Sequence, residues 1–363
     1  MIKIHKILCQ LGHIVSYPIL IMKVKISVGT FLLTLFNYLR YSIIELIIYL
    51  KLKEDMADQG ELDAHYTRMD KIFRLSLGDK GAYSGARFDG DFSMTTEEAQ
   101  LKKHDFIFDN CNIKEGSKVL DIGCGWGAFM DYLNGRGVDS CGVVLAKGQA
   151  DACVKNGLNV KHMDSKDITP ETFGQFDVVT AMGSPEHLCS VDEYEAGKQE
   201  EIYKKYFKQV ASLLPVGGRF YCQSMVFGPN MVDFKDIPFN KTDIKKKEFT
   251  NAEYMDIICR VFPGSWLPYG KEGLIDPAIS EHFKLVSVDS GRWDYVETIH
   301  RWTAQFKKFS FRKYLLFLSL IPDYLFDPTF REWMRRFKIQ ANLHVFDRHV
   351  FDHYRIVFEK VKN

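Results

Sequence analysis

The sequence lacks the cysteine arrangements that would hold a metal ion or a disulfide framework. Its eight cysteines are scattered over 363 residues, without a Cys-x-x-Cys pair or a cluster of cysteine and histidine at metal-ligand spacing. Scattered cysteines are typical of reduced thiols in a cytosolic protein, so we expect no zinc site and no other bound metal. A strong charge of either sign is also missing. The formal net charge is +1, and nothing in it indicates a nucleic-acid partner.

No secretory signal is recognisable, because the first apolar run begins late and no small-residue cleavage site follows it. Residues 1–53 carry seven basic residues and one acid, and residues 26–50 form a long apolar stretch. This stretch could lie in the membrane interface, span the bilayer, or pack on the core as a soluble helix, and the interfacial interpretation is favoured. We therefore expect residues 1–54 to be a hydrophobic, basic leader that associates with the cytoplasmic face of a membrane. A single span stays an alternative.

Strand and helix patterns alternate between residues 118 and 229, which predicts a parallel sheet covered by helices on both faces. Residues 55–105 are expected to form N-terminal cap helices, with one helix over 95–108. The main domain is expected to run over 106–363, with a lid insert at about 230–280. A long amphipathic helix is predicted over 195–214 and the last strand over 353–359.

The first strand of this region ends in a glycine-rich loop. Asp121 is followed by Gly123, Gly125 and Gly127, and a helical pattern begins at Ala128. Glycines here let the backbone approach a ligand, and the helix N-terminus points to the same crevice, so the loop predicts a nucleotide-like ligand. A dinucleotide site needs Gly-x-Gly-x-x-Gly and an acid after the second strand, and the sequence has neither. An NAD site is therefore disfavoured.

The loop and the turn at residues 213–218 (Leu-Leu-Pro-Val-Gly-Gly) together resemble class I S-adenosylmethionine-dependent methyltransferases. This resemblance implies a Rossmann-like α/β fold, with a seven-stranded, mostly parallel sheet and helical additions at both ends. It also implies S-adenosylmethionine as cofactor, with its methionine part held by the loop from Asp121 to Gly127.

Five motifs, one of them the glycine loop, narrow the resemblance to one family of these methyltransferases. They are His65-Tyr66, Tyr83-Ser84-Gly85-Ala86-Arg87-Phe88, Gly123-Cys124-Gly125-Trp126-Gly127, Gly183-Ser184-Pro185-Glu186-His187, and Trp293-Asp294-Tyr295 through Trp302. In this order they resemble the cyclopropane-fatty-acid-synthase family, which includes mycolic acid methyltransferases and some plant N-methyltransferases. The resemblance runs from about residue 60 to the end of the chain and does not cover the leader.

Carried over residue by residue, the resemblance implies a cofactor site and a catalytic group. The cofactor would lie under Tyr83 and Ser84, with its methionine part on Gly123 and Gly125, its ribose on Gln149, and its adenine end on Ser165 and Lys166. Glu186 and Tyr295 fall on the family's active-site acid and tyrosine, and the neighbouring His187 could share the role of Glu186.

The sequence departs from the family where cyclopropane synthases hold a bicarbonate ion as base. The resemblance implies a cysteine at Gly85, and a His-x-Ile motif where this chain reads Gln223-Ser224-Met225, while Glu186 and Tyr295 are retained. Addition of an alkene to a methyl cation equivalent leaves a carbocation, and closing a ring then requires a base. Without that base we expect a methyl or methylene product, or a nitrogen nucleophile.

Residues 301–340 carry nine basic residues and three acids beside apolar stretches at 314–320 and 324–326, a composition that suits an anionic lipid surface. The sequence therefore predicts a methyltransferase that acts at a membrane surface on a lipid, either an unsaturated acyl or an isoprenoid chain, by C-methylation or methylene transfer. Two alternatives stay open: N-methylation of a small amine or lipid head group, and cyclopropane fatty acid synthesis proper. A third alternative is a membrane protein that binds the cofactor without catalytic activity.

Overall fold

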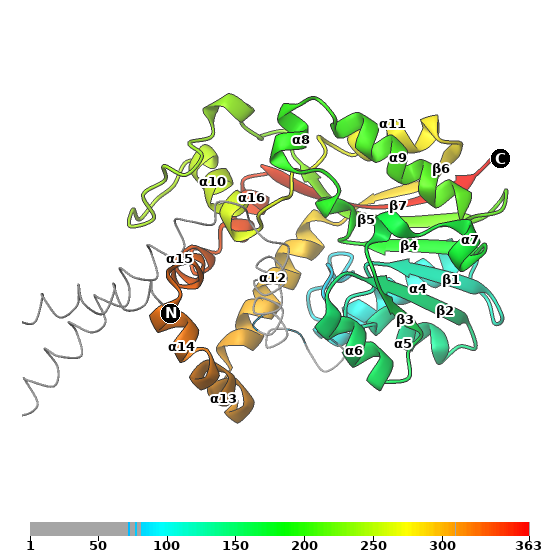
Figure 1. Ribbon diagram of the computed structural model, residues 1–363, viewed down its shortest axis with the longest axis horizontal. Coiled ribbons are helices and arrows are strands. Elements are labelled where there is room, and N and C mark those ends of the chain that lie inside the picture. Colours follow the sequence, from blue (N-terminus) through cyan, green and yellow to red (C-terminus); the bar gives the residue numbers. More distant parts are fainter. Residues whose placement is uncertain (1–71, 73–76, 78–80, 309, 363) are drawn as a thin grey trace, which may run out of the picture. The chain divides into compact units, whose positions relative to one another are not determined.

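Seven strands form one sheet in the order β3-β2-β1-β4-β5-β7-β6 (Figure 1). The computed structural model describes residues 72, 77, 81–308 and 310–362. The strands are β1 (Lys118–Ile122), β2 (Asp139–Val144), β3 (Val160–His162), β4 (Val178–Met182), β5 (Arg219–Phe227), β6 (Phe283–Ser290) and β7 (Phe351–Lys360). β1 to β5 are parallel, and β7 runs antiparallel between β5 and β6. The predicted Rossmann-like, mostly parallel sheet is confirmed.

Thirteen helices are described, and they are numbered from α4. They are α4 (Thr96–Asn110), α5 (Ala128–Asn134), α6 (Lys147–Lys155), α7 (Pro170–Phe173), α8 (Val191–Glu195), α9 (Gln199–Ser212), α10 (Asn251–Val261), α11 (Glu272–Ser280), α12 (Arg292–Lys307), α13 (Phe311–Ser319), α14 (Ile321–Phe326), α15 (Pro328–Phe337) and α16 (Ala341–Asp347). Three 3-10 turns complete the elements: η1 (Ser165–Asp167), η2 (Pro185–His187) and η3 (Phe234–Asp236). The leader predicted over residues 1–54 lies outside the described residues, and so does most of the segment before residue 81.

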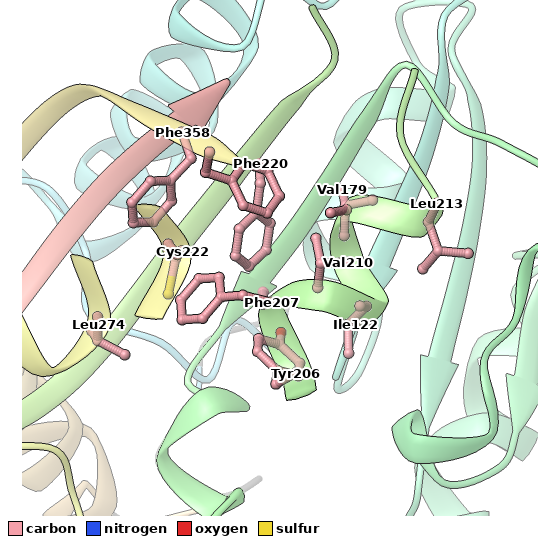
Figure 2. Close-up of a cluster of buried hydrophobic side chains, with 14 of the residues drawn as sticks. Ile122, Val179, Tyr206, Phe207, Val210, Leu213, Phe220, Cys222, Leu274 and Phe358 are labelled. Carbon is pink, nitrogen blue, oxygen red and sulfur yellow. The ribbon is translucent and has the colours of Figure 1, made fainter. Parts of the chain in front are cut away.

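Alternate residues of the strands supply two separate cores, one on each face of the sheet. On one face Phe220 and Phe358 pack against Phe207 of α9, with ring centroids 5.9 and 5.7 Å from that of Phe207 (Figure 2). The intervening residues Tyr221 and Val357 belong to the other core, which α4 and α5 cover. Successive side chains of each strand thus point to opposite faces of the sheet, and each face is covered by its own helices, as the sequence predicts.

Two element boundaries differ from the prediction. The helix expected over 195–214 is α9, which begins four residues later, at Gln199, because Gly197 takes a left-handed backbone (φ 73°) after α8 has ended at Glu195. The last strand begins at Phe351, two residues before the predicted start. The start of α4 agrees with the prediction, since Thr95 and Glu98 form a reciprocal capping box there.

A second helical layer, built from α10, α12, α15 and α16, has its own apolar core. Buried Trp266, Trp333 and Phe346 belong to it, and Trp333 Nε1 donates to the carbonyl of Val261 in α10 (3.1 Å). The predicted lid segment contributes α10 to this layer, while the loop before α10 is held by Asp256, whose carboxylate accepts from the backbone of Asn240 (2.8 Å). Its role as a lid stays a prediction.

One buried ion pair joins the sheet, this helical layer and the N-terminal segment. Arg355 of β7 is almost fully buried, and its Nη2 donates to Asp294 Oδ2 of α12 and to the carbonyl of Ala86, each at 2.7 Å. The other oxygen of Asp294 accepts from the backbone nitrogens of Phe88 and Asp89 (3.1 Å each). Asp294 therefore fixes residues 86–89 against both β7 and α12.

We expect Asp294→Ala to lower the free energy of unfolding by about 3–5 kcal/mol, because it leaves the Arg355 charge buried beside only a partial partner, Asp289. Urea unfolding followed by circular dichroism measures the change. Asp276→Ala, at an exposed position of α11, is the matched control and should stay within about 0.5 kcal/mol of wild type. Equal stabilities for the two variants would show that the ion pair does not hold the fold together.

Candidate active site

A cavity of about 1310 Å³ opens at the carboxyl ends of the parallel strands, the edge where open α/β sheets bind ligands. It is larger than the roughly 300–1,000 Å³ of a pocket for one small ligand. One end is walled by the loops after β1, β2, β3 and β4, and the other by apolar residues of α10, α12, α13 and α15. The volume therefore suits two ligands, one at each end.

The glycine loop after β1 forms the wall of the first end. Gly123 and Gly125 line the cavity, and both have left-handed backbones (φ 80° and 55°). A Cβ at Gly123 would lie 2.5 Å from Ser184 Cβ, whereas a Cβ at Gly125 would meet nothing within 4 Å. Gly127 does not line the cavity. A Cβ there would lie 2.3 Å from Leu158 Cδ1, so packing against the segment before β3 is what requires this glycine.

Asp121 presents a carboxylate oxygen that lacks a partner at the same end of the cavity. Its Oδ1 accepts from Thr180 Oγ1 (2.7 Å), while Oδ2 is buried with no hydrogen-bond partner among the described residues. Burial raises the pKa of Asp121 to about 6, despite the opposing effects of the Thr180 hydrogen bond and of Lys103. An unpaired acceptor beside an open glycine backbone fits a cationic amine, such as the one on the methionine part of S-adenosylmethionine.

The N-terminal segment covers this end of the cavity. Tyr83 stacks on Trp302 of α12 with ring centroids 5.3 Å apart, and Ser84 Oγ accepts from Lys103 Nζ at 2.6 Å. Lys103 is buried, and burial together with nearby Arg355 lowers its pKa to about 7. Sequence reasoning missed Lys103 as a cavity residue, because Lys102 and Lys103 differ only in which side of α4 they occupy.

The remaining predicted cofactor residues line the same end. Gln149 of α6 and Ser165 and Lys166 of η1 all belong to the cavity wall. With the single exception of Gly127, every residue predicted to contact the cofactor thus borders one connected space. The donor set, consisting of backbone glycines, an unpaired carboxylate and polar side chains after β2 and β3, fits the cofactor that the sequence predicts.

The three predicted catalytic residues lie where the two ends of the cavity meet. Glu186 is buried, and its Oε1 accepts from the backbone nitrogen of Met225 (2.8 Å). Burial raises the pKa of Glu186 to about 8, so this carboxyl group is mostly protonated at neutral pH. Tyr295 also lines the cavity, and its pKa is well above the usual value because of burial and the nearby Glu186. His187 is exposed and bonds through Nδ1 to Ser265 Oγ (2.6 Å).

The positions that depart from the family motif form a second cluster at this junction. Gln223 does not offer a free polar group, because Nε2 donates to the carbonyl of Gly85 (3.0 Å) and Oε1 accepts from Tyr221 (2.8 Å). A Cβ at Gly85 would lie 2.5 Å from Tyr295 Cδ2 and 3.2 Å from Cε1 of His353. The space beside Gly85 is therefore filled by these two rings.

His353 is a cavity residue that sequence reasoning missed. It sits on β7 opposite Met225 of β5, and its ring stacks on Tyr295 with centroids 4.8 Å apart. The sequence carries no local signal for this placement, because His353 lies in a strand that is paired with β5 only through the antiparallel register. The sequence does not specify that register, so it does not show that His353 reaches the cavity wall.

One face of α12 leads from this junction into the apolar end of the cavity. Tyr295, Ile299, Trp302, Thr303 and Phe306 line the cavity at the i, i+4, i+7, i+8 and i+11 positions of the helix. The opposite wall is supplied by Met255, Ile258, Phe317, Met334 and Phe337 of α10, α13 and α15. We call this part of the cavity the apolar arm.

The described residues contain neither a metal-type cluster nor a candidate membrane span. No three histidine, cysteine, aspartate or glutamate side chains gather in the described part of the chain as they would around a metal ion. Within residues 81–308 and 310–362, no helix has both the length and the hydropathy of a bilayer-spanning segment.

We expect Glu186→Gln to stabilise the protein at high pH but not at low pH. The raised pKa means that native Glu186 binds a proton more tightly than in the unfolded chain, so its contribution to stability is complete below about pH 4.5 and is lost as pH rises through about 8. Glutamine removes this loss, so the free energy of unfolding should rise by roughly 2–4 kcal/mol at pH 8.5 and stay nearly unchanged at pH 4.5. Urea unfolding at both pH values measures this change in the free energy of unfolding.

Glu195→Gln, at an exposed position, is the control. An increase in the free energy of unfolding of Glu186→Gln that does not depend on pH would contradict the raised pKa of Glu186.

The chain is similar in sequence to one protein family and to several of its named members. The family model for mycolic acid cyclopropane synthetase matches residues 53–313. Cyclopropane mycolic acid synthase 1 of Mycobacterium tuberculosis is 28% identical over 252 residues, which is 68% of this chain and 81% of that protein. Hydroxymycolate synthase MmaA4 of the same organism is 28% identical over 246 residues, covering 67% of this chain and 76% of that protein.

The fold agrees with solved structures of the same group. The structure of mycolic acid cyclopropane synthase CmaA1 complexed with SAH and CTAB has a TM-score of 0.63, with 23% sequence identity, and covers 85% of this chain and 100% of its own. The family match spans well over half of the 363 residues and includes the glycine loop, Glu186 and Tyr295. The chain therefore belongs to the mycolic acid cyclopropane synthetase family and is an S-adenosylmethionine-dependent enzyme of the methyltransferase type.

Proposed function

We propose that this enzyme transfers a methyl group to an unsaturated carbon of a long lipid chain, by C-methylation or methylene formation. The observation that carries the proposal is the apolar arm, which continues from the predicted cofactor residues past Glu186 and Tyr295. S-adenosylmethionine supplies an electrophilic methyl group, and methyl transfer then depends mainly on alignment of the acceptor carbon in a dry pocket. The apolar arm provides both the alignment and the exclusion of water.

The dimensions of the apolar arm suit a long chain rather than a small amine. The cavity-lining face of α12 runs from Tyr295 to Phe306, a distance of about 17 Å at the helical rise of 1.5 Å per residue. A small amine would leave most of this length empty. The relatives support the same conclusion, since they are named for mycolic acids, which are long-chain lipids.

The charge state of the junction favours an alkene over an amine as the acceptor. Glu186 is mostly protonated near neutral pH, and Tyr295 keeps its proton, so neither side chain presents an anion to the acceptor. An amine acceptor must lose the proton of its ammonium form before it can attack the methyl group, and would be better served by a carboxylate that accepts this proton. An uncharged junction leaves Glu186 and Tyr295 to orient the chain and to exclude water from the acceptor carbon.

Blocking the apolar arm tests the proposal. We expect Thr303→Phe to lower kcat/KM for a long-chain unsaturated lipid about tenfold or more, while a short-chain alkene that does not enter the arm is affected about twofold or less. The assay measures label from methyl-labelled S-adenosylmethionine in the acyl fraction after the head groups are removed.

Two control variants separate filling of the arm from other effects. Ala304→Phe puts the same ring on the exposed side of α12, and Thr303→Val removes the hydrogen bond from Gln340 without filling the arm. Both should retain the wild-type preference for long chains. Wild-type label found only in head groups or in water-soluble amines would contradict lipid C-methylation.

We further propose that α13 and α14 bring the mouth of the apolar arm to an anionic membrane surface. These two helices leave nine large apolar side chains exposed: Phe311, Tyr314, Leu315, Phe317, Leu318, Ile321, Tyr324, Leu325 and Phe326. Exposed apolar side chains that gather on neighbouring elements are typical of interaction surfaces. Figure 1 shows α13 and α14 at the end of α12 that lies away from the sheet. We call this set the α13–α14 surface.

A lipid bilayer is the occupant that the surroundings of the α13–α14 surface favour. Phe317 belongs both to this surface and to the cavity wall, so a lipid chain has a short apolar route into the arm. Lys307, Lys308 and Arg335 are exposed at the ends of the neighbouring helices and suit anionic head groups. Basic and apolar residues from the segment 301–340 therefore lie together at and beside the α13–α14 surface.

We expect the double variant Phe311→Glu/Leu315→Glu to raise KM for lipid presented in anionic vesicles about tenfold or more, because it removes two apolar anchors and adds like charges. The kcat should stay near wild type when the same lipid is presented in detergent micelles. Val154→Glu/Val216→Glu, at two exposed positions elsewhere, is the matched control. Equal vesicle kinetics for the two double variants would assign membrane contact to another part of the chain or to the leader.

A further inference from the structure

We propose that His353 is the proton acceptor of the reaction, and that it removes a proton from the substrate after the new carbon–carbon bond has formed. The inference rests on the proposed C-methylation. It assigns to this chain's own side chain the acid–base step that the residues at Gly85 and Gln223 do not provide.

The surroundings of His353 form a fitted site for its ring. A Cβ at Gly85 would lie 3.2 Å from Cε1, and a Cβ at Gly291 would lie 2.5 Å from Nδ1, so the absence of side chains at both positions makes room for the imidazole. Tyr295 covers one face of the ring. His353 is 1% exposed, yet it belongs to the cavity wall, so the ring is shielded from bulk water and reaches the ligand space.

The hydrogen bonding of His353 leaves it able to accept a proton. Its Nδ1 is buried beside the backbone of Gly291 and has no partner at normal hydrogen-bond geometry among the described residues. Burial, with Arg355 of β7 and Lys103 of α4 nearby, lowers the pKa of His353 well below its usual value, against a smaller opposing effect of the Gly291 backbone. The ring is therefore neutral at physiological pH.

The other titratable groups at the junction are poorly suited to the same task. Glu186 is mostly protonated at neutral pH, and Tyr295 retains its proton, so neither is a ready acceptor. His187 also lines the cavity and burial lowers its pKa, but its Nδ1 is engaged by Ser265 (2.6 Å). Of these groups, His353 is the one that has a buried ring nitrogen without a partner at normal hydrogen-bond geometry.

The π pair of the substrate alkene forms a bond to the transferred methyl carbon, the carbon–sulfur bond breaks, and S-adenosylhomocysteine is released. The substrate is left as a carbocation, which loses a proton from an adjacent carbon to the imidazole of His353. The carbon–hydrogen pair becomes a new double bond, and the proton leaves His353 for solvent during turnover. No oxidant or reductant is needed.

The test uses the full-length enzyme with vesicle lipid and analyses the products by mass spectrometry. We expect His353→Gln to slow formation of the unsaturated methylated product about 100-fold or more, the contribution of a general base. The share of products in which the cation has rearranged by a hydride shift before it loses a proton should rise, because the cation then lasts longer. His300→Gln, on the exposed face of α12, is the matched control. Imidazole added to His353→Ala should restore part of the unsaturated product.

The outcomes separate the inference from the proposed function. A wild-type enzyme that places no label in the lipid chain refutes the proposed function. A wild type that does so, with His353→Gln unchanged in rate and product ratio, overturns the role of His353. A slower variant with an unchanged product ratio and no rescue by imidazole also overturns it, because a purely structural role has those effects.

A measurement on the wild type keeps the inference testable if the variants do not fold. Nitrogen-15 NMR of histidine-labelled protein reports the charge of each ring without turnover. We expect the imidazole of His353 to stay neutral at about pH 6.5, where an ordinary histidine is half charged. A ring of His353 that is charged at pH 7 would overturn the proposal, because an imidazolium cannot accept a proton.

Discussion

The buried Arg355–Asp294 ion pair is the constraint on which the reactive part of the structure depends. It joins three segments that are far apart in the chain: β7, the start of α12 and residues 86–89. Each segment carries a junction residue within a few positions of the ion pair, namely His353 on β7, Tyr295 on α12 and Gly85 before residue 86. A guanidinium removed from water is tolerated only when its partners are well placed, so the ion pair fixes these segments in one geometry. The close packing of Tyr295, His353 and Gly85 follows from that geometry.

The cavity divides into parts with different electrostatics, and this division gives the enzyme its chemistry. The first end has titratable groups whose pKa values have moved toward neutrality, with Asp121 at about 6 and Lys103 at about 7. Such an end suits a polar, charged cofactor. The junction is uncharged around Glu186 and Tyr295, and the arm beyond it is apolar as far as Phe317 on the α13–α14 surface. A methyl donor and a lipid chain can therefore enter from opposite sides and meet in a region without water.

Local sequence signals predicted much of this arrangement, while long-range pairing accounts for what was missed. The glycine loop after Asp121 and the alternation of strand and helix are short-range patterns, and the sheet they predict is confirmed. Gly127 shows the limit of such a motif, because its spacing matches the loop but its backbone packs against Leu158 away from the cavity. The start of α9 was placed four residues too early, because the left-handed backbone of Gly197 separates Glu195, at the end of α8, from this helix. His353 was missed because only the β5–β7 register places it opposite Met225, and no local pattern encodes that register.

The central claim is that a lipid chain occupies the apolar arm and presents an unsaturated carbon at the junction of Glu186, Tyr295 and His353. The most direct measurement is a crystal structure of the enzyme with S-adenosylhomocysteine and a long-chain unsaturated lipid. The account predicts the lipid chain along the α12 face from Tyr295 to Phe306, with its double bond beside these three side chains and the cofactor product against Asp121 and Gly123. A lipid chain bound outside the apolar arm, or one whose double bond lies away from the junction, would contradict it.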